Sequence, residues 1–192
     1  KAKGLDFSRI LPVDGEVSPV AVDPNEGKYR AIGEYLARRY KAWGDMTTKI
    51  VAKAHVIGGR FNFDPMLILA VISIESSFNP IAESSMGAKG LMQVIPRYHP
   101  EKFDQLGGEK VVFEPEANIM VGTRILRDYL RFTGDLGDAL QMYVGATTVE
   151  NEKGYSGKIM LERDRLNQVL RKYQIQNRTA QQHAVPSPAS PI

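Results

Sequence analysis

Glu75 is the residue whose setting points most directly to chemistry. It lies near the end of a long apolar stretch, and on a helix the positions around it on its own side are Ile68, Val71, Ile72 and Phe78. Desolvation in such surroundings disfavours a charged carboxylate, so we expect the pKa of Glu75 to be raised. A carboxyl group that keeps its proton near neutral pH can serve as a general acid. The structural alternative is an ion pair with an Arg or Lys of a neighbouring helix.

Small and polar residues follow the acid. Ser76 and Ser84 offer hydroxyl groups, Gln93 offers an amide, and Gly87 and Gly90 would let a polymer approach the backbone closely. Each glycine taken alone is equally typical of an ordinary loop turn. Together the residues favour a cleft that binds a sugar polymer over a closed core.

Two short motifs stand close together within residues 68–96, namely Glu75-Ser76 and Gly90-Leu91-Met92-Gln93. This stretch resembles the catalytic core of the soluble lytic transglycosylase family, which cleaves bacterial peptidoglycan and has the goose-type lysozyme fold. Glu75-Ser76 corresponds to the family's catalytic Glu-Ser pair, and the second motif reproduces its Gly-Leu-Met-Gln sequence. Ser84 falls on the family's serine that hydrogen-bonds the acid, and Tyr143 falls on a family tyrosine. The resemblance covers about residues 60–173.

The resemblance implies a catalytic role for Glu75 and a substrate-binding role for a further set of residues. These are Ser76, Ser84, Met86, Gly90, Leu91, Met92, Gln93, Tyr143 and Tyr155. Within the set, Ser84 would orient the carboxyl group, Tyr143 would place its hydroxyl near it, and Met92 with Gln93 would line the glycan groove.

The implied reaction needs one carboxyl group and no water. Glu75 protonates the glycosidic oxygen between N-acetylmuramic acid and N-acetylglucosamine. As a carboxylate it then accepts the proton of the C6 hydroxyl, which closes on C1 to give a 1,6-anhydromuramoyl end. Using one residue as acid and then as base requires a pKa near the working pH.

Two alternatives remain open. A hydrolytic muramidase of the same fold would need a second carboxylate to position water, for which the sequence offers Glu83, Glu101, Asp104 and Glu114 in stretches that we interpret as exposed. A weakly active peptidoglycan-binding scaffold is suggested by Val144, which replaces the family's asparagine and cannot form a hydrogen bond.

Composition excludes several other classes of protein. The chain has no cysteine, which rules out a thiol nucleophile and thiolate-bound metals. His55, His99 and His183 are too far apart for a paired metal-ligand spacing, so we predict neither a metal nor another cofactor. The net charge is +3 with scattered basic residues, which argues against a nucleic-acid partner.

The elements that must position Glu75 are all predicted to be helical. Apolar residues recur at steps of three and four over about 32–43 and 50–61. The aromatic stripe Tyr35, Tyr40 and Trp43 on the first could stack on sugars if exposed, but side chains at this helical spacing are more often buried in the core. A third helix begins at Asp64 and Pro65 and stops before Asn79. Further helices are expected over about 115–132, 136–144 and 155–173. The fold class is therefore all-α, a lysozyme-like bundle of about seven helices with a glycan-binding groove.

The domain organisation follows from proline and glycine content. We expect an extended arm at 1–25, N-terminal helices at 26–59, the catalytic domain at 60–173 and a disordered tail at 174–192. The first residue is Lys1, so we expect the chain to be processed or trimmed. No apolar stretch reaches the roughly 20 residues that span a bilayer. A peptidoglycan substrate would place the protein in the periplasm or cell envelope.

Overall fold

The computed structural model describes residues 23–145 and 149–183, with side chains described outside 149–153 and 183. These residues form seven α-helices: α1 (Glu26–Tyr40), α2 (Gly44–Phe61), α3 (Pro65–Ser76), α4 (Pro100–Asp104), α5 (Pro115–Thr133), α6 (Leu136–Val144) and α7 (Val149–His183). Two short 3-10 turns lie at Pro96–Tyr98 and Glu109–Val111. Isolated bridges from Lys89 to Glu83 and Val94 are the only β pairing in the described part. The predicted all-helical class is confirmed there.

Helix α3 is the centre of the fold. The side chain of Asp64 accepts a hydrogen bond from the backbone N–H of Met66 at 2.9 Å, and Pro65 occupies the first helical position. Every residue from Met66 to Ser73 is buried, so the helix has no face for water. Burial on all sides matches the sequence pattern and leaves only the two ends of α3, Pro65 and residues 74–76, partly exposed.

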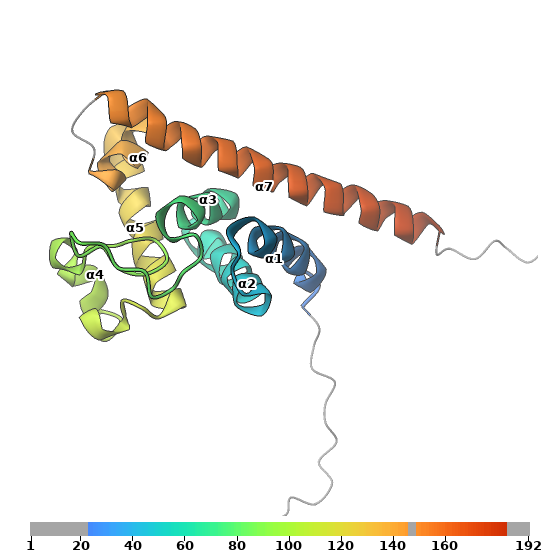
Figure 1. Cartoon of the computed structure of the whole chain (residues 1–192), viewed down its shortest axis with the longest axis horizontal. Coiled ribbons are helices and arrows are strands. Elements are labelled where there is room, and N and C mark those ends of the chain that lie inside the picture. The colour runs from blue at the N-terminus through green and yellow to red at the C-terminus, as the bar shows by residue number, and fades with distance from the viewer. Residues whose placement is uncertain (1–22, 146–148, 184–192) are drawn as a thin grey trace, which may run out of the picture.

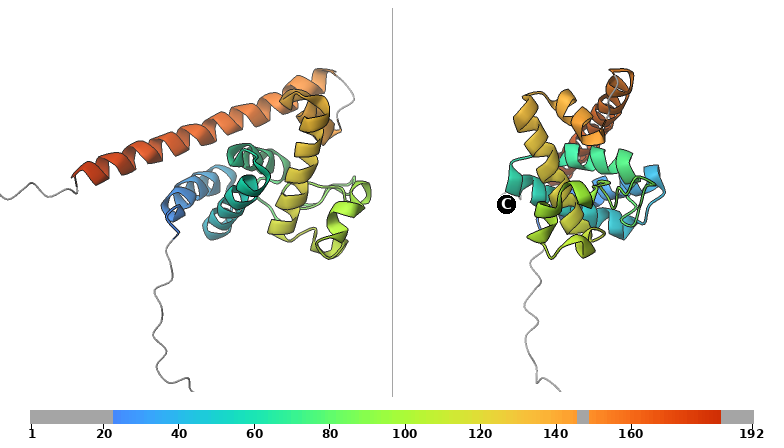
Figure 2. Two further views of the ribbon diagram at one scale, coloured as in Figure 1. Left: turned by 180° about the vertical axis from the view of Figure 1, so that it is seen from behind. Right: turned by 90° about the vertical axis from the view of Figure 1, so that its left-hand side faces the viewer.

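Helix α7 covers α3 and α1 (Figure 1). Arg163 on α7 donates to Asp64 at the start of α3 at 2.6 Å, and Glu162 pairs with Arg39 of α1 at 3.0 Å. The other views show the same crossing, with α5 and α6 at one end of α7 and α1 toward the other (Figure 2). The long helix therefore ties the start of α3 to itself and to α1.

The sequence prediction was wrong about the length of this helix. Helix α7 begins at Val149 rather than near 155 and continues to His183, through part of the predicted disordered tail. Residues 158–185 contain neither glycine nor proline, so nothing in them ends a helix. The rest of that tail, 184–192, and residues 1–22 of the predicted arm lie outside the described residues.

The N-terminal helices form as predicted, with one exception. Ile32 and Leu36 are fully buried, whereas Trp43 is 82% exposed. Helix α1 ends at Tyr40 because Lys41 adopts a left-handed conformation with φ of 54°, and Trp43 becomes the residue that precedes α2. The helical spacing that suggested a buried stripe does not apply beyond that turn. None of the helices in the described residues combines the length and apolar character needed to cross a membrane.

Candidate active site

Glu75 occupies the penultimate position of α3 and is half-buried. Burial raises its pKa above the ordinary value, and a hydrogen bond donated by the Tyr155 hydroxyl to Oε1 offsets part of that rise. No Lys, Arg or His among the described residues forms an ion pair with it, so the structural alternative considered for Glu75 is not realised. The site holds a carboxyl group with a neutral hydrogen-bond donor as its partner.

The chain turns sharply directly after the acid. Ser77 and Phe78 both have positive φ, 51° and 66°, which costs about 1 kcal/mol for each residue with a side chain. The buried ring of Phe78 packs against Tyr40 with centroids 5.8 Å apart and holds the turn in place. Helix α3 consequently ends one residue beyond Glu75, and its carboxyl group lies at the end of a buried element.

The Gly-Leu-Met-Gln segment is held by Asn118 of α5. The buried amide of Asn118 accepts from the N–H of Met92 at 2.8 Å and donates to the carbonyls of Lys89 and Val112 at 2.9 and 2.8 Å. A Cβ atom on Gly90 would lie 2.3 Å from that amide nitrogen, and Gly90 has φ of 75°. Asn118 is a functional residue that the sequence analysis did not identify, although a polar amide on the inward face of a helix was the available signal.

Leu91 and Met92 lie beneath the site and do not line it. Both are fully buried, which corrects the expectation that Met92 contacts the glycan. The carbonyl of Met92 accepts a hydrogen bond from the Tyr143 hydroxyl at 2.8 Å. A Cβ atom on Gly122 would lie 2.6 Å from the sulfur of Met92 and 2.9 Å from that hydroxyl, so α5 must have a glycine there. Met92, Gly122 and Tyr143 therefore pack closely against one another.

Tyr143 and Tyr155 lie within electrostatic reach of the acid. Burial raises the pKa of both phenols, and the negative charge of Glu75 raises each of them further. Both phenols therefore stay protonated at the pH of any ordinary compartment. Tyr155 was predicted to bind substrate, and in the structure its hydroxyl contacts the acid itself.

Ser84 does not take the position expected of it. Its hydroxyl accepts a hydrogen bond from the N–H of Ala88 at 3.1 Å, within its own loop, and makes no hydrogen bond to Glu75. The loop closes on itself because the N–H of Ser84 also bonds the carbonyl of Ala88 at 2.9 Å. The orienting contact predicted for Ser84 is made by Tyr155.

The other predicted binding residues are distributed around the loop. Gln93 donates its amide to the carbonyls of Ala82 and Gly90 at 3.1 and 3.0 Å, and it lines a hollow of about 150 Å³ together with Tyr143 and Val144. Met86 is 68% exposed. Ser76 donates its hydroxyl to the carbonyl of Ile72 at 3.1 Å.

The candidates for a second carboxylate lie on the surface. Glu83, Glu101, Asp104 and Glu114 are all exposed, and none hydrogen-bonds to Glu75 or to Tyr155. Over 23–145 and 149–183 no three or more His, Asp or Glu side chains gather in a way that could hold a metal ion. The arrangement around Glu75 offers one proton donor and acceptor, with two phenols beside it.

Comparison with known proteins yields a family match. A family model described as the transglycosylase SLT domain matches residues 53–160, more than half of the chain. That range includes every predicted site residue and begins inside α2.

Individual relatives are similar over shorter segments. The transglycosylase of Enterobacteria phage PRD1 is 37% identical over 105 residues, which cover 53% of this chain and 38% of the phage protein. Membrane-bound lytic murein transglycosylase C of Actinobacillus pleuropneumoniae serotype 5b (strain L20) is 40% identical over 78 residues, 36% of this chain and 21% of that protein. The chain thus spans well under half the length of these relatives.

Solved structures are similar as well, among them the complex of the 70-kDa soluble lytic transglycosylase with bulgecin A. It has a TM-score of 0.47 and 20% identity, over 78% of this chain and 30% of that one.

Proposed function

Because the chain belongs to the transglycosylase SLT-domain family, we propose that it is a lytic transglycosylase acting on peptidoglycan, with Glu75 as its acid and base. One observation carries the proposal. Glu75 is a half-buried carboxyl group at the end of an apolar helix, without a cation partner and with a raised pKa. The names of the phage and Actinobacillus relatives support the same reaction.

The first step is protonation of the leaving group. The bond between C1 of N-acetylmuramic acid and the oxygen of N-acetylglucosamine breaks while that oxygen takes the proton of Glu75. The raised pKa of Glu75 shifts its equilibrium toward the protonated form that this step requires. Positive charge develops at C1, where the N-acetyl group of the substrate can stabilise it.

The second step returns the proton to Glu75. The carboxylate accepts the proton of the C6 hydroxyl while O6 forms a bond to C1, which gives a 1,6-anhydro end and restores the acid. Tyr155 supports this step because its hydroxyl donates to the carboxylate and stabilises the ionised form. Its own raised pKa means that it remains a donor and does not compete as a base.

A hydrolytic reaction is less well supported. An inverting or retaining glycosidase places two carboxyl groups on either side of the scissile bond, roughly 5 to 9.5 Å apart. The exposed candidates Glu83, Glu101, Asp104 and Glu114 make no contact with the groups around Glu75. We therefore favour attack by the substrate's own hydroxyl, and with it a site of action in the periplasm or cell envelope, where the polymer lies.

Mass spectrometry of soluble products released from purified peptidoglycan tests the reaction. Wild-type protein is expected to release muropeptides lighter by one water than their hydrolytic counterparts. Glu75→Gln is expected to release them orders of magnitude more slowly, because an amide cannot supply the proton. Glu83→Gln is the matched control on an exposed glutamate and is expected to behave as wild type.

The alternatives give different products. Full reducing ends would establish hydrolysis and a second carboxylate. A folded wild-type protein that binds peptidoglycan and releases no product would establish the scaffold function, with Val144 as the residue to restore to asparagine.

A further inference from the structure

The turn between α1 and α2 presents the only tryptophan of the chain to solvent. Trp43 is 82% exposed, and Met46 and Ile81 near it are 41% and 73% exposed. Apolar side chains grouped on a protein surface usually mark a binding site. The family match begins at residue 53, so Trp43 and Met46 lie outside the matched domain.

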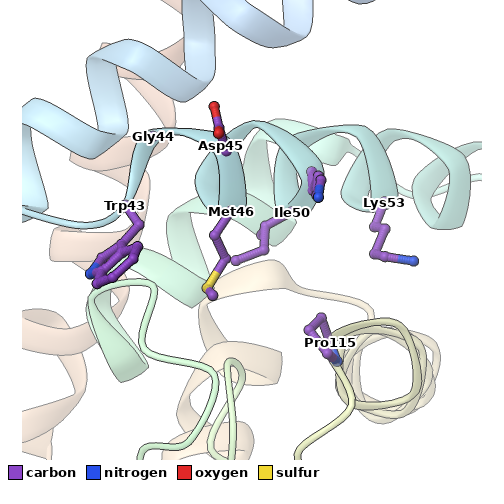
Figure 3. A pocket seen from close by; sticks show the side chains of 8 residues that line it. Trp43, Gly44, Asp45, Met46, Ile50, Lys53 and Pro115 are labelled. Atoms are coloured by element: carbon purple, nitrogen blue, oxygen red, sulfur yellow. The ribbon is translucent and has the colours of Figure 1, made fainter.

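Two hollows meet at these side chains. The first, of about 650 Å³, runs from Trp43 and Met46 to the segment that follows the acid, from Ser76 to Ile81. The second, also about 650 Å³, runs along α2 toward Pro115 at the start of α5. Figure 3 shows Trp43, Met46 and Ile50 on the α2 side of this second hollow, with Pro115 opposite. Trp43 and Met46 therefore form a ridge shared by both hollows.

The chemistry of the first hollow fits an N-acetylated sugar. A pyranose ring has apolar C–H faces and polar hydroxyl and amide groups at its edges. Trp43 and Met46 offer apolar surface to the ring face, and the opposite wall carries Ser77 and Asn79, whose side chains can hydrogen-bond to the edges. Lys41 is the one charged residue in the lining, which does not suit a polyanion such as a nucleic acid.

The first hollow also reaches the end of α3 that carries Glu75. Ser76, which follows Glu75 directly, lines it. A glycan strand with its scissile bond at Glu75 extends several sugars beyond that bond, and this hollow leads from Ser76 to the tryptophan.

We propose that Trp43, with Met46, forms a sugar-stacking subsite for the glycan strand, away from the bond that is cleaved and contributed by the N-terminal helices. This inference rests on the proposed function for the identity of the strand. Stacking one N-acetylhexosamine ring on Trp43 holds a long strand in register and has no effect on short fragments that end before the ridge.

The single tryptophan makes the subsite directly observable. Glu75→Gln protein, which leaves the ligand intact, is titrated with peptide-free peptidoglycan glycan strands, and Trp43 emission is followed beside binding measured by calorimetry. We expect a saturable change in emission with long strands and none with the isolated disaccharide at the same sugar concentration. Calorimetric binding of long strands with unchanged emission would overturn the proposal, as would strands that do not bind.

Variants separate stacking from general effects. In the Glu75→Gln background, Trp43→Ala is expected to weaken binding of long strands about fivefold, the size of a lost aromatic contact, and Trp43→Phe to recover most of it. Phe132→Ala is the matched control, because Phe132 is 81% exposed and lies roughly 25 Å along α5 from Pro115. Equal weakening by Trp43→Ala and Phe132→Ala would contradict the inference.

Failure of the inference and failure of the proposed function give different results. Anhydro products from wild type together with unaltered strand binding by Trp43→Ala would remove only the subsite. A tryptophan response to long strands without any cleavage by wild type would keep the subsite and remove the proposed reaction.

Discussion

Helix α7 shields two glutamates from water, and their surroundings are opposite in kind. Glu75 at the end of α3 receives a hydrogen bond from the neutral phenol of Tyr155 and has a raised pKa. Glu162 on α7 is 1% exposed, yet it lies 3.0 Å from a guanidinium nitrogen of Arg39 and 3.0 Å from one of Arg165. The carboxyl group of Glu75 is half-buried without a cation, and that of Glu162 is fully buried between two.

The difference shows that burial alone does not make an acid reactive. Two guanidinium groups pair with the carboxyl group of Glu162, so it serves as an electrostatic link between α1 and α7. A phenol donates a hydrogen bond without contributing a positive charge, so desolvation dominates at Glu75 and its pKa is raised. The ion pair considered from sequence for Glu75 is the arrangement that the fold provides at Glu162.

The largest expected effect concerns activity. Removing the titratable group by Glu75→Gln is expected to lower the rate of peptidoglycan cleavage roughly 10²–10⁴-fold, because general acid catalysis is lost. Glu162→Gln is expected to keep the wild-type rate within about twofold, since Glu162 contacts neither Glu75 nor the loop that carries Gln93. Release of soluble muropeptides, measured at a temperature where both variants are folded, gives the two cleavage rates. Similar losses of rate in Glu75→Gln and Glu162→Gln would contradict the difference drawn between the two glutamates.

The second effect concerns stability, and here Glu162→Gln is the variant expected to have an effect. Glu162→Gln is expected to lower the free energy of unfolding by about 1–2 kcal/mol, less than for a fully buried pair because the two arginines remain over a third exposed. The melting temperature should fall by roughly 4 °C. Glu34→Gln, which removes an exposed ion pair with Arg38, is the control and should change stability by less than about 0.5 kcal/mol. A melting curve of Glu162→Gln that overlays that of wild type would mean that the pairs contribute nothing.

The smallest effect is a pH dependence specific to Glu75. Its pKa is raised in the folded protein, so its contribution to stability is fully present below the ordinary value of 4.5 and is lost as pH rises through the raised value. As pH rises from 4.5 through the raised pKa, wild type should therefore lose stability relative to Glu75→Gln. The difference in stability between the two proteins should level off at higher pH. Melting temperatures of the two proteins from pH 4 upward measure it, and parallel curves would show that burial does not shift this group.

Several features could be predicted from the sequence because they depend on local order. Asp64 and Pro65 mark the start of α3, its apolar composition requires burial on all sides, and Glu75 interrupts that composition at a defined position. The motifs around Glu75 and Gly90 are contiguous, so their similarity to a family could be recognised without a fold. The family match to residues 53–160 confirms that recognition.

Other expectations failed where a nearby backbone group or a turn determined the outcome. Ser84 binds Ala88 in its own loop, Met92 is covered by Gly122 and Tyr143, and Trp43 is exposed because Lys41 ends α1 before it. Helix α7 extends to His183 although its last part buries nothing, since no residue there interrupts helical hydrogen bonding.

The sequence by itself determined that Glu75 ends a buried helix and that the chain belongs among helical transglycosylase domains, because helix signals and short motifs are properties of neighbouring residues. The tertiary structure decided what surrounds each carboxyl group. Tyr155 is 80 residues from Glu75 along the chain and Arg39 is 123 residues from Glu162. The pKa of Glu75 and the ion pair of Glu162 both depend on groups within a few ångströms, and only the packing of α7 against α3 and α1 brings those groups that close.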